Sequence, residues 1–271
     1  MKTPPPIAER LTPAAGAEPL VDTRFLALVG LVLIALAFGF KSELIGPGQS
    51  WSLGAALVIV AGPALFTYLR VGTGELPAVE HFVPAVIAAI AITGLSVLVA
   101  EWWKYALMTV AYGAFFVVTS HLDHRRLRAS EKPGHVIVQE AIQAMTLAIA
   151  FLVVIVATSL SLPLRLGWIF VIAVLAAFRS FRVLGRPMPG NRAFLFAILV
   201  GQVVTFFAWA VSVYVPFNEG TMAVMLMLAW YINRGVIRHT AEETLSRQIA
   251  LEYGAFAAIL AFLFFTSAHF R

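Results

Sequence analysis

The chain has 271 residues, of which 61% are hydrophobic and 12% are charged, with a formal net charge of +5 and no cysteine. A water-soluble domain has roughly a quarter charged residues, so this composition indicates a protein that lies in lipid. The positive charge does not indicate a nucleic-acid partner, because the basic residues fall in short segments between apolar runs, as membrane topology requires. The lack of cysteine excludes disulfides, zinc–thiolate sites and cysteine-held iron–sulfur clusters.

Residues 1–24 are rich in proline and alanine, and we predict that they form a cytoplasmic tail. Residues 25–271 are predicted to be a single transmembrane helical domain, because apolar runs of membrane-spanning length follow one another along them. The predicted spans are 25–40, 51–69, 82–100, 105–120, 136–160, 166–181, 193–215, 220–236 and 248–268. These runs do not alternate apolar and polar residues as barrel strands do, so we predict an all-α, polytopic transmembrane helical bundle of about nine (eight to nine) spans. The sequence shows no convincing internal repeat.

The lysines and arginines are distributed unevenly between alternate loops. With a cytoplasmic N-terminus most of them lie inside, which is the pattern that orients membrane proteins. We therefore predict a multi-pass protein of the bacterial cytoplasmic (inner) membrane. Basic side chains at the inner ends of spans are candidate contacts to anionic lipid headgroups. These candidates are Arg125, Arg126, Arg128, Arg179, Arg182 and Arg186.

The polar segment 121–135 lies between the fourth and fifth predicted spans, and we predict that it is a cytoplasmic loop. No lysine, arginine or aspartate is expected within the core of a span. The segment contains His121, Asp123 and His124, which are residue types that bind metal ions. Histidine-rich membrane hydroxylases and desaturases use several closely spaced histidine pairs, whereas this segment offers a single one. We therefore predict that the protein holds neither a metal nor a cofactor. These three residues are the candidate ligands if a metal does bind.

A polar face opens the fifth predicted span. His135, Gln139 and Gln143 recur every four residues and so share one side of a helix, with Glu140 beside them. Glu252 lies about one turn into the ninth predicted span. A carboxylate at such depth is costly unless it is paired, hydrated or protonated, and it is therefore a functional candidate.

Gln202 lies deeper, roughly 13 Å into the seventh predicted span. It is expected either to line a cavity or to form a hydrogen bond between helices. The structural alternative for Glu140 and Glu252 is that they extend to the interface or pair with arginines such as Arg179 or Arg238. The full set of candidate cavity residues is His135, Gln139, Glu140, Gln143, Gln202 and Glu252.

Three functions are compatible with these patterns. The first is a non-catalytic subunit or assembly scaffold of a larger membrane complex, suggested by the segregation of charge and by the 21 phenylalanines available for packing. The second is a transporter or flippase for a small apolar or anionic amphiphile, with the candidate residues lining a cytoplasm-facing cavity. The third is a membrane enzyme with a cytoplasmic histidine and carboxylate site. The expected partners are membrane lipids and other membrane protein subunits.

Overall fold

The computed structural model describes residues 23–43, 50–73, 78–127, 133–157, 160–183, 188–214 and 218–267. These ranges are almost entirely helical and contain no strand, which confirms the all-α prediction. The helices are α1 (Thr23–Glu43), α2 (Ser50–Thr73), the short 3-10 helix η2 (Val79–His81), α3 (Val83–Leu98), α4 (Trp102–Leu127), α5 (Pro133–Val156), α6 (Leu162–Val183), α7 (Gly190–Tyr214), α8 (Glu219–Ala241) and α9 (Arg247–Ser267). Of the predicted N-terminal tail, residues 1–22 lie outside the described ranges.

Eight helices within the described ranges, α2 to α9, are long and apolar enough to cross a membrane. The apolar stretch of α1 is shorter and covers Arg24–Phe40. The predicted number of eight to nine spans agrees with this architecture, which is that of a multi-pass membrane protein.

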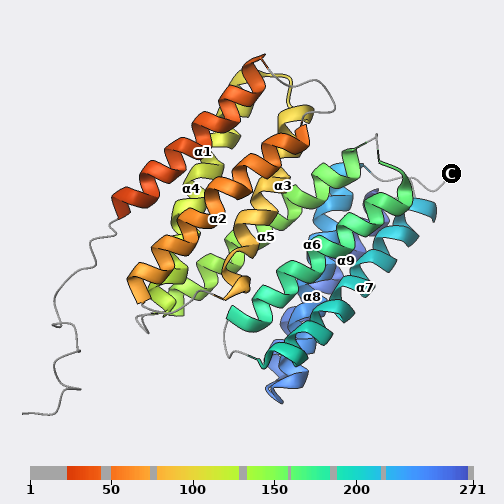
Figure 1. Ribbon diagram of the computed structural model, residues 1–271. Coiled ribbons are helices and arrows are strands. Elements are labelled where there is room, and N and C mark those ends of the chain that lie inside the picture. The colour runs from red at the N-terminus through yellow and green to blue at the C-terminus, as the bar shows by residue number, and fades with distance from the viewer. Residues whose placement is uncertain are drawn as a thin grey trace, which may run out of the picture.

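The helices form two groups with the same packing order (Figure 1). In the first group, α1 packs against α2 and α4, and α3 packs against α2 and α4. In the second group, α5 and α7 each pack in the same way against α6 and α8, and α9 lies against α8. Four helices that alternate in direction return the chain to the same end of the bundle, so the two groups run parallel and are not inverted. The structure therefore repeats a packing order that the sequence does not reveal.

The two groups meet mainly where α3 packs against α5. Gly94 of α3 allows this approach, because a Cβ atom there would overlap the side chain of Val153. A small residue has the same use between α6 and α7, where a Cβ atom at Gly201 of α7 would overlap the side chain of Val174 of α6. Close packing of small side chains is a principal source of helix association in lipid.

The prediction of a loop over 121–135 is wrong at both of its ends. Residues 121–127 form the last two turns of α4, and residues 133–135 form the first turn of α5. Residues 128–132 lie outside the described ranges. The helix continues past residue 120 because its polar side chains find partners inside the bundle, where a buried polar group is stabilised by hydrogen bonds.

Candidate functional site

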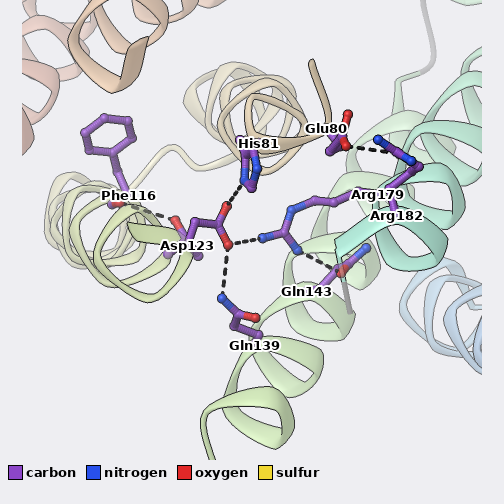
Figure 2. Close-up of polar contacts among 9 residues, drawn as sticks. Glu80, His81, Phe116, Asp123, Gln139, Gln143, Arg179 and Arg182 are labelled. Carbon is purple, nitrogen blue, oxygen red and sulfur yellow. Dashed lines mark hydrogen bonds and ion pairs between the residues drawn. The ribbon is translucent and has the colours of Figure 1, made fainter. Parts of the chain in front are cut away.

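A buried ion pair joins the two groups of helices at one end of the bundle (Figure 2). Asp123, near the end of α4, accepts a hydrogen bond of 2.8 Å from Arg179 of α6. The side chains of both residues are only 2% exposed. The Nε2 of Gln139 on α5 donates to the same carboxylate at 3.0 Å, and His81 of η2 donates through Nδ1 at 3.2 Å. One carboxylate thus connects four elements of the chain.

Gln143 extends this network toward the middle of the bundle. Its Oε1 accepts a hydrogen bond of 3.3 Å from Arg179, and its Nε2 donates to the carbonyl of Ala176 at 2.8 Å. Gln139, Gln143 and Arg179 line a cavity of about 10 Å³, which is room for about one water molecule. Two buried atoms beside it, Oε1 of Gln139 and Nε of Arg179, have no hydrogen-bond partner among the described residues. The cavity therefore has one acceptor and one donor available on its wall.

A second buried cluster begins at the neighbouring residue of α6. Arg234 of α8 donates to the hydroxyl of Ser180 at 2.8 Å and to Glu140 of α5 at 2.9 Å. The guanidinium of Arg234 also lies 5.1 Å from the ring centre of Tyr231, whose hydroxyl donates to Glu252 of α9 at 3.3 Å. Glu140 and Glu252 therefore converge on Arg234 and Tyr231 of α8.

These clusters define one end of the bundle, which we call the network end. The helices α2, α4, α6 and α8 finish there, and α3, α5, α7 and α9 begin there. A third ion pair at the network end joins Arg182 to Glu80 at 3.0 Å. Each of the three pairs connects two elements that are distant in sequence, so the charges act between helices and not within one.

Three charged residues lie in the last two turns of spanning helices, close to the ends of the predicted spans and outside their cores. Asp123, Arg179 and Arg234 fall inside apolar helices long enough to cross a membrane, and all three are buried. The prediction that Arg179 contacts lipid headgroups is wrong, since its guanidinium is buried against Asp123. The energetic cost of placing such charges in a low-dielectric interior requires that they be paired.

Sequence reasoning missed the Asp123–Arg179 pair because it ended the fourth span at residue 120. A signal was present, since Phe116, Ser120 and Asp123 recur at helical spacing and all three are buried on one face of α4. His81 carried no comparable signal, because it lies on a single turn of 3-10 helix.

The other candidate residues lie apart from the network. Gln202 is exposed on α7, so it neither lines a shared cavity nor faces another helix as predicted. His135 lies in the first turn of α5 and Arg126 in α4, but their side chains are not described. Arg125 is exposed near the end of α4, while Arg128 and Arg186 lie outside the described ranges.

The metal candidates have other contacts. Asp123 is engaged as above, and the ring of His124 lies 4.8 Å from that of Tyr68 of α2. The hydroxyl of Tyr68 lies 3.5 Å from Nδ1 of His121. Within the described part of the chain, no three potential metal ligands lie together.

A groove of about 420 Å³ runs between α3, α4 and α5 toward the opposite end of the bundle. Its walls are mostly apolar and include Ile92 and Leu152, with the hydroxyl-bearing Tyr112 and Thr146 among them. Its lips carry exposed apolar side chains: Met108, Val118, Met145 and Ile149 are between 37% and 68% exposed. The groove thus opens sideways, where the hydrocarbon of a bilayer would lie. It shares Phe115, Ile142 and Thr146 with the small polar cavity, so the two spaces are adjacent.

The fold and this site define a class of protein, a multi-pass α-helical membrane protein with interhelical ion pairs at one end and an apolar groove beside them. Residues 48–267 match the model of a protein family, which is described as "Protein of unknown function (DUF5656)". Because the match covers most of the chain, the protein belongs to this family. Neither the curated proteins nor the solved structures contain a match.

Proposed function

We propose that the protein takes up a small apolar molecule or amphiphile from the bilayer and acts as its transporter or flippase. The observation that carries this proposal is the groove between α3, α4 and α5. Its volume of about 420 Å³ lies within the range of about 300–1,000 Å³ that ligand sites occupy. Its opening toward lipid would allow a hydrocarbon chain to enter without crossing water.

The small cavity lined by Gln139, Gln143 and Arg179 adjoins the groove and suits the polar head of such a ligand. Arg179 and Asp123 neutralise each other, so the cavity offers hydrogen bonds and not a net charge. Gln139 and Arg179 contribute one acceptor and one donor that are unused by the described residues. This favours a neutral head, such as a hydroxyl or a carbonyl, over an anionic head. We propose that the network end faces the cytoplasm of a bacterial cell, in keeping with the basic residues near it.

Filling the groove tests this function. The probe is a long-chain alcohol that carries a photoactivatable diazirine, offered to the protein in lipid nanodiscs. Ala111 of α4 lines the groove and is exposed, so Ala111→Trp fills it without entering the core. We expect photolabelling of α4 and α5 to fall by about 10-fold, which corresponds to about 1.4 kcal/mol of lost binding.

The matched control is Ala258→Trp, since Ala258 is an exposed alanine of α9 that lies away from the groove. This variant should be labelled as strongly as the unaltered protein. Equal labelling of both variants, or label spread evenly over all exposed helices including α9, would show that the groove is ordinary lipid-facing surface.

A non-catalytic subunit or scaffold is the second candidate, and α9 favours it. This helix packs against α8 and leaves most of its surface uncovered, including Leu251, Phe262 and Phe265, which are 65–67% exposed. Such a face would suit a helix of another membrane protein. Extraction of native membranes in mild detergent tests this role: a stoichiometric partner supports it, and a lone monomer speaks against it.

A further inference from the structure

A second cavity lies at the network end, separate from the groove. It has a volume of about 450 Å³ and lies between the beginning of α7 and the turn that follows α8. Its apolar lining includes Met188, Leu195 and Phe196, and its charged residues are Arg192, Glu242 and Glu243. Apolar and charged side chains side by side at the end of two membrane-spanning helices suit a lipid headgroup and the upper part of its chains.

The charged residues that line this cavity do not form ion pairs with one another. Glu242 is engaged by Arg238, whose Nε donates to it at 3.1 Å. Arg192 and Glu243 are both exposed, and neither has an ion-pair partner among the described residues. Among the described residues, the cavity therefore presents one available positive and one available negative group, whose charges sum to zero.

The backbone around Arg192 and Glu243 also bears on what each residue can bind. Arg192 lies in the first turn of α7, where unpaired N–H groups and the helix dipole favour a negative group. Glu243 has a φ of 54°, the only positive φ of a non-glycine residue within the described ranges. Glycine is the residue that ordinarily takes this position after a helix. A glutamate there places a carboxylate at the rim of the cavity at some cost to the backbone.

We propose that this cavity binds the headgroup of a zwitterionic phospholipid with a primary amine, of the phosphatidylethanolamine type. Arg192 binds the phosphate, since a guanidinium makes paired hydrogen bonds to phosphate oxygens. Glu243 accepts hydrogen bonds from the ammonium group. The acyl chains leave the cavity along α7, over Leu195, which is 65% exposed, and Leu199, which is 45% exposed. A soluble phosphoethanolamine would lack this apolar contact, so the ligand is the lipid.

Native mass spectrometry of the protein, released from nanodiscs with equal parts phosphatidylethanolamine, phosphatidylglycerol and phosphatidylcholine, tests the proposal. We expect retained phosphatidylethanolamine to exceed each of the others by about 10-fold, the effect of one charge-assisted hydrogen bond. Glu243→Gln should abolish this preference, and Arg192→Gln should reduce retention of all three lipids. Both side chains are exposed, so neither variant disturbs the core.

Glu101→Gln is the matched control, because Glu101 is an exposed glutamate at the opposite end of the bundle. It should leave the lipid preference unchanged. Phosphatidylglycerol retained as strongly as phosphatidylethanolamine, or an unaltered preference in Glu243→Gln, would overturn the proposal. Displacement of the lipid by an equal concentration of soluble phosphoethanolamine would overturn the assignment to a lipid.

Discussion

Replacing Asp123 by leucine is expected to destabilise the protein by about 3–5 kcal/mol, because it leaves the charge of Arg179 buried without a partner. Arg179 is only 2% exposed and cannot reach water without separating α6 from α4 and α5. Gln139 and His81 lose the same acceptor. The measurement is unfolding of the purified protein in detergent, by heat or by titration with dodecyl sulfate, followed by tryptophan fluorescence.

The double variant Asp123→Leu with Arg179→Leu distinguishes the cost of an unpaired buried charge from the cost of altered packing. Replacing both members of a buried ion pair by apolar residues is often close to neutral, so the double variant should recover most of the lost stability. Lys104→Ala is the control, since Lys104 and Glu101 form an exposed pair of 2.7 Å that is worth about 0–1 kcal/mol. If Asp123→Leu costs no more than Lys104→Ala, or if the two leucine substitutions add without coupling, the pair does not hold the helices together.

The sequence was sufficient to predict the class of fold and the approximate position of each span, because apolar runs of about 20 residues are the strongest signal that a membrane protein carries. It was not sufficient to place the ends of the helices. The polar residues after 120 predict the end of a span there, yet α4 continues to Leu127. Hydropathy assigns polar residues to loops, whereas the ion pair with Arg179 keeps Asp123 inside the bundle.

The candidate site was predictable in part. Helical spacing correctly placed Gln139 and Gln143 on one face of α5, and both are buried there. Spacing along one helix does not identify the helix opposite, so it did not predict that Glu140 pairs with Arg234. Depth in a span was also a poor guide, because Gln202 lies deep in α7 but faces outward. Partners between helices come from tertiary packing, which the sequence of one chain does not display.

A second large loss of stability is expected from a substitution at the contact between α3 and α5. Gly94→Ala is expected to destabilise the protein by about 1–3 kcal/mol, the usual cost of inserting an atom into a packed interior. The added Cβ atom would overlap the side chain of Val153, which is buried and, being β-branched, has little freedom to move aside. The same unfolding measurement applies. Gly62→Ala is the control, because a Cβ atom at Gly62 of α2 meets no neighbouring atom.

A second substitution and a second measurement connect this junction to the groove. Val153→Ala should restore part of the stability of Gly94→Ala, since it removes both Cγ atoms that the new methyl group meets and leaves only the Cβ atom of residue 153 at 2.9 Å. Leu95 and Leu152, the chain neighbours of Gly94 and Val153, both line the groove. If α3 and α5 move apart in Gly94→Ala, the groove changes width and photolabelling by the long-chain alcohol should change with stability. Labelling that stays constant while stability falls would mean that the spacing of α3 and α5 does not set the shape of the groove.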